Sequence, residues 1–319
     1  MLRTARGMLA TSVVVAALAA SCGGGTGKAN GAAAQKGSGT TEAFQPPTPL
    51  QAVQNAIVAT RNAQSASYAG TFFFDAGPLG TNDPAAGVVK LQNGNAAYTV
   101  DMHTATIGLV PPGTPPAQIQ LHVLDLGDKL YLNFPVAFAS AKGVGNKWVS
   151  IPQYSAPAGE KNPPGFEGVN SRVFLAARLL RPATCLGIVQ GATSARVVGP
   201  EDVRGKPTTR YSIQWAPRKW VENSGLFYFF GKDRSPAHLA VIDRILGQAT
   251  TADVWIDDLG RIRKIVSTSD LTVIKPYMDV SVRGGPWRSL RTECDLYNYG
   301  APTGSIAAPT TVFVPPATG

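Results

Sequence analysis

Hydrophobic and polar positions alternate along much of this chain, which is the pattern of strands with one buried face. The clearest case is residues 119–123, where isoleucine, leucine and valine are separated by glutamine and histidine. Further strand-like segments are residues 68–76, 88–91, 96–102, 129–134, 147–151, 195–199, 208–215, 251–256, 261–268, 279–283 and 293–299. Residues 77–84 read as a turn, and Asn93 with Gly94 is typical of a tight hairpin turn. Hairpins imply antiparallel pairing.

A few segments instead carry apolar residues at helical spacing. They are residues 48–63, 171–180 and 235–246. Thr48 followed by Pro49 is typical of a helix start, and so is Ser235 before its proline. The helix at Ser171 is expected to stop at Pro182. A twisted antiparallel sheet with helices over one face is the expected assembly, which is an α+β fold.

The first 22 residues have a different pattern. Arg3 and Arg6 precede an apolar run over residues 8–20, and small residues then lead into Cys22. This order is typical of a secretory signal, and the run is shorter than the roughly 20 residues of a membrane-spanning helix. The sequence Leu-Ala-Ala-Ser-Cys that ends at Cys22 resembles the lipobox of bacterial lipoproteins, whose cysteine is diacylated after cleavage before it. The alternative is an ordinary secreted protein with an incidental cysteine.

The lipobox reading divides the chain into four parts. Residues 22–46 are mostly glycine, alanine, serine and threonine, a composition typical of a flexible tether. The predicted parts are a lipoprotein signal peptide (1–21), the tether (22–46), one folded domain (47–300) and a tail rich in proline, threonine and alanine (301–319). The length of the mature chain also allows two smaller domains.

Composition narrows the class of partner. The chain of 319 residues has a formal net charge of +9, and about +7 remains after residue 21 because the removed part contains two arginines and no acid. This charge favours an anionic membrane surface, or it serves solubility alone. No dense cluster of lysine and arginine is present, so we expect no nucleic-acid partner.

The chain contains three cysteines, an odd number for an exported protein. If Cys22 carries lipid, Cys185 and Cys294 remain as a pair, and an oxidising compartment permits a disulfide between them. Such a long loop is worth about 4–5 kcal/mol in the chain-entropy model. The alternative is two separate buried thiols.

Several segments, taken in order, resemble the lipid-carrier superfamily that includes LolA and the actinobacterial LppX/LprG-type lipoproteins. The matching segments are residues 50–63 with the strand after them, 127–131, 147–149, 198–211, 254–262 and 296–300. The resemblance covers most of residues 48–300. It implies a half-open antiparallel β-barrel, a strongly curved sheet, with helices covering its concave, apolar face. It also implies a cavity for acylated ligands that are carried or presented between membrane layers.

No pattern in the sequence points to catalysis. His103, His122 and His238 lack the partners of a nucleophilic or zinc-dependent hydrolase. Asp257 and Asp258 lie in a predicted turn, where aspartate commonly bonds the backbone, so no metal is expected. We also expect no cofactor. An enzyme whose site is scattered beyond motif detection stays a weaker alternative.

Aromatic segments are the candidates for contact with an acyl chain. Residues 226–230 form an apolar run that is either ordinary core or a lid at the mouth of the cavity. Phe72 and Phe74 share one face of a strand, and the sequence leaves open which face lines the cavity. The candidate residues are Phe72, Phe74, Leu226, Phe227, Phe229 and Phe230.

These observations predict a non-catalytic lipoprotein on the outer face of the cell membrane, attached through a diacylglyceryl group on Cys22. Its expected ligand is a lipid or lipidated glycan, carried or presented between envelope layers. An envelope transporter or acceptor protein is the expected protein partner. The alternative is a docking or sensing subunit of an envelope complex, with the half-barrel filled by its own side chains.

Overall fold

The helix expected from residue 48 is present as α1 (Pro49–Asn62). Its N-cap is Thr48, whose hydroxyl accepts a hydrogen bond from the backbone NH of Gln51. The Gln51 side chain accepts a bond in return from the backbone NH of Thr48. This capping box, with Pro49 at the first position, explains why the helix starts here.

The computed structural model describes much of the chain from residue 46 onward. The described residues are 46–75, 81–103, 118–127, 129–134, 147–152, 177–216, 218, 220, 235–237, 240, 244, 250–270, 272 and 288–313. Among these residues, no helix is both long enough and apolar enough to cross a membrane. The predicted signal peptide, Cys22 and nearly all of the predicted tether lie outside the described residues.

In this part of the chain, eleven strands form one antiparallel sheet. They are β1 (Ser65–Asp75), β2 (Thr81–Lys90), β3 (Ala96–His103), β4 (Gln118–Asp125), β5 (Lys129–Asn133), β6 (Val149–Pro152), β7 (Ala192–Val203), β8 (Lys206–Trp215), β9 (Thr250–Asp257), β10 (Ile262–Asp270) and β11 (Ser289–Tyr297). Their spatial order is β6-β5-β4-β3-β2-β1-β11-β10-β9-β8-β7. Two meanders, β1–β6 and β7–β11, therefore meet where the first strand pairs with the last.

The pairing of β1 with β11 sets the register at the centre of the sheet. Tyr68 lies opposite Leu296, and Phe72 lies opposite Thr292. All four of these side chains are buried, because directly opposed residues of an antiparallel pair share a face. The centre of the sheet thus joins residues more than 200 positions apart in the sequence.

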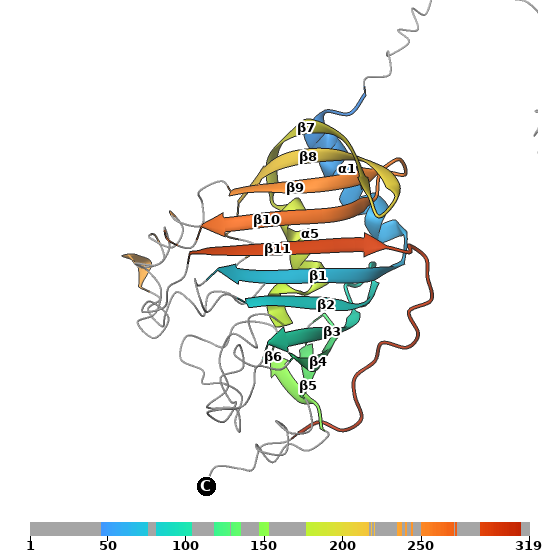
Figure 1. Ribbon diagram of the computed structural model, residues 1–319, viewed down its shortest axis with the longest axis vertical. Coiled ribbons are helices and arrows are strands. Elements are labelled where there is room, and N and C mark those ends of the chain that lie inside the picture. Colours follow the sequence, from blue (N-terminus) through green and yellow to red (C-terminus); the bar gives the residue numbers. More distant parts are fainter. Residues whose placement is uncertain are drawn as a thin grey trace, which may run out of the picture. The chain divides into compact units, whose positions relative to one another are not determined.

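One face of the sheet, the inner face, carries the apolar side chains and the helices. Among its buried residues are Tyr68, Phe72, Tyr98, Val100, Leu121, Val123, Leu132, Ile213, Trp215, Val254 and Leu296. The helix α5 (Pro182–Gln190) packs on this face against β8, β10 and β11. Both α1 and α5 lie behind the strands in Figure 1. Among the described residues, α1 and α5 therefore lie mainly on the β7–β11 half.

The sheet is strongly curved and stays open. α1 contacts the edge strand β7 and also β9 and β10, so the strands bend around the helix (Figure 1). Within the described residues, β6 and β7 are the two edges and do not pair with each other. The predicted half-open antiparallel barrel, with helices on its concave apolar face, is confirmed.

The predicted turn over residues 77–84 extends too far, because β2 already begins at Thr81. Pro84 lies in this strand, opposite Thr71 of β1. The pairing of β2 with β3 begins one residue later, at Ala85. Proline has no NH to donate, and it is tolerated where a strand has a neighbour on one side.

The prediction that a helix stops at Pro182 is only partly right. Residues 177–179 are helical, as the sequence predicts, but Pro182 then starts α5 as its first residue. Proline suits this position because the NH it lacks would have no partner within the helix. The sequence analysis therefore missed the helix that carries Cys185.

Residues 301–313 run from the end of β11 back to the edge strand β6, as the red trace in Figure 1 shows. Just before β6, the backbone NH of Trp148 donates to the Thr311 carbonyl over 3.0 Å. The Trp148 carbonyl accepts from the NH of Phe313 over 2.7 Å. The first part of the predicted tail is thus packed against the domain.

Candidate functional site

A disulfide between Cys185 of α5 and Cys294 of β11 holds α5 on the inner face. Their Cα atoms are 6.4 Å apart, and both residues are buried. The structure thus contains the pair that the cysteine count indicates. The bond joins a helix to a strand at the centre of the sheet. It therefore fixes the position of α5, which forms one side of the pocket described below.

Two buried tyrosines hold the residues that precede α5. The hydroxyl of Tyr68 donates to the Leu180 carbonyl over 2.6 Å, and that of Tyr98 donates to the Ala177 carbonyl over 2.7 Å. Their rings pack edge to face with centroids 5.9 Å apart. Burial raises the pKa of both hydroxyls far above the usual value, so both stay protonated and continue to donate.

A buried ion pair connects the start of α5 with the β4–β5 hairpin. The Nε of Arg181 lies 2.6 Å from Oδ2 of Asp125, and its Nη2 lies 3.1 Å from Oδ1. The two side chains are 6% and 0% exposed. Asp125 also accepts from the backbone NH of Gly127 over 3.2 Å. Two parallel bonds of this kind fix the orientation of both groups.

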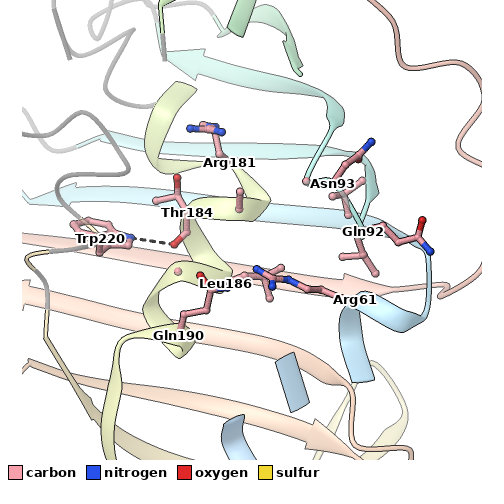
Figure 2. A pocket seen from close by; sticks show the side chains of 13 residues that line it. Arg61, Gln92, Asn93, Arg181, Thr184, Leu186, Gln190 and Trp220 are labelled. Carbon is pink, nitrogen blue, oxygen red and sulfur yellow. Dashed lines mark hydrogen bonds between the residues drawn. The ribbon is translucent and has the colours of Figure 1, made fainter. Parts of the chain in front are cut away.

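A pocket of about 340 Å³ lies between the end of α1, the β2–β3 hairpin and α5 (Figure 2). The hairpin side is shaped by Gly94, whose φ of 73° suits glycine, and by Asn93, whose side chain accepts from the backbone NH of Asn95. The Leu91 NH donates to the Gln64 carbonyl over 2.7 Å, which ties the hairpin to the end of α1. A volume of this size is within the range of small-molecule sites.

The floor of the pocket is apolar. Val89, Leu91 and Leu186 are buried and belong to the main hydrophobic core. Trp220 forms part of the wall, and its indole NH donates to the Thr184 carbonyl over 3.0 Å (Figure 2). The pocket therefore borders the main hydrophobic core.

The rim is polar. Gln92, Asn93, Gln190 and Arg61 line it and are exposed. Within the described residues, the Arg61 side chain has no hydrogen-bonding or ionic partner, whereas the other lining arginine, Arg181, is held by an aspartate. A pocket with an apolar floor and a cationic rim suits an amphiphile whose head is anionic or accepts hydrogen bonds.

The predicted cavity residues are only partly described. Phe72 is buried on the inner face, whereas Phe73 points the other way and is 40% exposed. Phe74 shares the face of Phe72 by strand alternation, and its side chain lies outside the described part. Leu226, Phe227, Phe229, Phe230 and Cys22 also lie outside it, and their roles stay predictions.

The sequence analysis named none of the pocket residues as candidates for binding; Asn93 and Gly94 appear there only as a hairpin turn. The apolar run that follows Pro182 was a usable signal for α5, because a proline there is typical of a helix start. No local pattern links Arg61 to Asn93 or to Leu186, because three separate elements bring them together.

Among the residues considered for chemistry, Asp257 has a structural role. His122 is exposed on β4, and the side chains of His103 and His238 lie outside the described part. Asp257 accepts from the backbone NH of Leu259 and from the side chains of Arg261 and Arg263. Burial alone would raise the pKa of Asp257, but hydrogen bonds from these arginines outweigh it and hold the pKa below its usual value. Asp257 thus stabilises its turn.

Comparison with known proteins gives likenesses of fold. No protein-family model matches the chain, and no curated protein matches its sequence. The structure is similar to LprF from Mycobacterium bovis, with 15% identity, a TM-score of 0.34, and coverage of 82% of this chain and 96% of LprF. It is similar to the Mycobacterium tuberculosis lipoprotein LppX, with 13% identity, a TM-score of 0.40, and coverage of 81% and 97%.

A third similar structure is a LolA superfamily protein from Nitrosomonas europaea, with 9% identity, a TM-score of 0.23, and coverage of 79% of this chain and 93% of that one. These proteins are of the kind that the sequence resembles.

Proposed function

We propose that this chain is a cell-envelope lipoprotein that binds a lipid or lipidated glycan and carries or presents it between envelope layers without catalysing a reaction. The observation that carries the proposal is the pocket between α1, α5 and the β2–β3 hairpin, with its apolar floor and polar rim. An amphiphile has the same two parts, so its acyl chain would enter toward Leu186 and its head would stay near Arg61.

Beyond the helices, the inner face is lined by apolar side chains that are themselves buried. α5 packs on β8, β10 and β11, whereas Val100, Leu121 and Leu132 continue the apolar face on β3, β4 and β5. Burying one CH₂ group contributes about 0.8 kcal/mol, so ten such groups contribute about 8 kcal/mol. A ligand of this class therefore needs few polar contacts for tight binding.

The proposed place of action is the outer face of the cell membrane. This proposal is supported by the lipobox-like sequence Leu-Ala-Ala-Ser-Cys over residues 18–22. The predicted tether over residues 22–46 would let the domain reach away from the bilayer. A diacylated cysteine gives stable attachment where one acyl chain would not. A transporter or acceptor protein in the envelope would then receive the ligand.

Lipid binding is tested by native mass spectrometry of the full chain, purified from a bacterial membrane in a mild detergent, with organic extraction of non-covalent lipid. We expect a stoichiometric lipid in the extract, since the acyl groups on Cys22 are covalent and stay with the protein. The absence of extracted lipid, together with no uptake of a fluorescent fatty acid, would contradict the proposal.

The position of the ligand is tested by Gly187→Leu. A Cβ added at Gly187 would lie 3.7 Å from Cδ1 of Trp220, an ordinary contact, so a larger side chain enters the pocket without a backbone clash. We expect this variant to lose most of the extracted lipid. Gln54→Leu, on the exposed side of α1, is the matched control and should retain it. Equal lipid content in both variants would place the ligand elsewhere.

A docking or sensing module is the second candidate. Tyr68, Met102 and Trp215 are fully buried and fill much of the interior, while Val197 and Val198 on the edge strand β7 are 52% and 45% exposed. A filled interior beside exposed apolar residues favours contact with another protein. A lipid-free chain in the extraction experiment would support this candidate.

Acylation of Cys22 is a separate prediction. In a bacterial host fed an alkyne-tagged palmitate, the wild-type chain should become labelled and Cys22→Ser should not, because the serine cannot form the thioether. The double variant Cys185→Ser with Cys294→Ser is the control and should keep the label. In-gel fluorescence after coupling to an azide dye measures the result, and labelling of Cys22→Ser would contradict the assignment.

A further inference from the structure

The outer face of the sheet, away from α1 and α5, has a hollow of about 350 Å³ over β7–β11. Three arginines and three hydroxyl side chains contribute to its lining; they are Arg196, Arg210, Arg291, Ser212, Thr251 and Thr268. This composition is unlike that of the inner pocket, whose floor is apolar. The hollow is thus a second concavity, partly open to solvent and separate from the inner pocket.

The strand register explains why these residues come together. Arg196 of β7 lies opposite Ser212 of β8, and Ser212 lies opposite Asp253 of β9. Directly opposed residues share a face, so these side chains form one row across the outer surface. Adjacent strands are about 4.8 Å apart, so the Arg196 side chain is long enough to reach its neighbour's hydroxyl.

Arg210 is held in place within the hollow. Its Nη2 lies 2.7 Å from Oδ2 of Asp253, and its Nη1 lies 3.5 Å from Oε2 of Glu201. The hydrogen bond to Asp253, more than any other contact, raises the pKa of Arg210. Arg210 thereby neutralises Asp253, the one carboxylate among the residues that line the hollow.

Arg196 is the cation without a carboxylate. At the far end of the hollow, Arg291 and Lys264 both bond Glu293. In and beside the hollow, four cations therefore lie near three carboxylates: Arg196, Arg210, Lys264 and Arg291 near Glu201, Asp253 and Glu293. Among the described residues, the Arg196 side chain has no hydrogen-bonding or ionic partner. Arg196 is exposed at the edge of the open volume, so its NH donors are accessible to a ligand there.

We propose that this hollow binds a phosphate-type oxyanion, either free or as the headgroup of an anionic lipid. The guanidinium of Arg196 meets the anion with its planar fork of NH donors, and the hydroxyl of Ser212 donates beside it. Because Asp253 balances the charge of Arg210, Arg196 supplies the net positive charge at the site. Because the hollow lies on the face opposite the pocket, this site does not depend on lipid binding within the domain.

The test uses isothermal titration calorimetry on the full chain in a neutral detergent at low salt. Inorganic phosphate is the probe for a free oxyanion, and glycerophosphoglycerol, a headgroup without acyl chains, is the probe for a lipid source. Arg196→Gln removes the proposed donor. Lys206→Gln is the matched control, because Lys206 is exposed on the adjacent hairpin and does not line the hollow.

We expect one equivalent of at least one probe to bind, with affinity about tenfold lower in Arg196→Gln and within about twofold of wild type in Lys206→Gln. Binding of inorganic phosphate alone assigns the site to free oxyanions. Stronger binding of glycerophosphoglycerol than of phosphate assigns it to lipid headgroups. Failure of both probes to bind wild type would overturn the proposal, and so would equal weakening in the two variants.

Discussion

Replacing Cys185 and Cys294 together with alanine is expected to lower the free energy of unfolding by about 4–5 kcal/mol. The disulfide joins residues 109 positions apart, so its loss restores a large amount of freedom to the unfolded chain. It also removes the covalent link that holds α5 against β11. Urea unfolding followed by tryptophan fluorescence, with wild type and variant at equal concentration, measures the change.

Reduced wild type is the matched control for this prediction. Reduction breaks the cross-link but leaves both sulfur atoms in the core, including the contact of Cys294 Sγ with the Tyr68 hydroxyl at 3.9 Å. If loop closure is the main contribution, reduced wild type and the double variant should unfold at similar urea concentrations. An oxidised wild type no more stable than either would contradict the prediction.

Asp125→Ala is expected to cost about 3–5 kcal/mol, because it leaves the Arg181 guanidinium buried without its carboxylate. The Arg181 side chain is only 6% exposed, so solvent cannot replace the lost partner. The variant also frees the Gly127 NH and loosens the attachment of α5 to the β4–β5 hairpin. Urea unfolding gives the energy, and hydrogen exchange of α5 amides gives the local effect.

Two further variants separate a buried charge from a lost contact. Asp125→Leu combined with Arg181→Met removes both charges and should recover most of the stability, because an apolar pair of similar volume replaces a buried ion pair at little cost. Arg204→Ala breaks the exposed pair with Asp295 and should cost less than about 1 kcal/mol. A similarly small cost for Asp125→Ala would show that the buried pair contributes little.

Local patterns in the sequence account for most of the elements. The capping box at Thr48 and Gln51 lies within four residues, and hydrogen bonds of that range depend on local sequence. The turn at Asn93 and Gly94 likewise uses the positive φ that glycine tolerates. Pro84 and Pro182 were misread because proline has two opposite uses: its neighbours in space, and not its type, decide whether it ends an element or lies within one.

The sequence by itself determined the alternation of buried and exposed strand residues, the hairpins, α1, and the cysteine count that indicates one disulfide. Only the tertiary structure decided that β1 pairs with β11, that Arg61, Leu91 and Leu186 border one pocket, and that Arg196 faces an open hollow on the other side. The physical reason is range. Capping, turns and alternation arise between residues a few positions apart, whereas register and pockets depend on how distant apolar faces pack together.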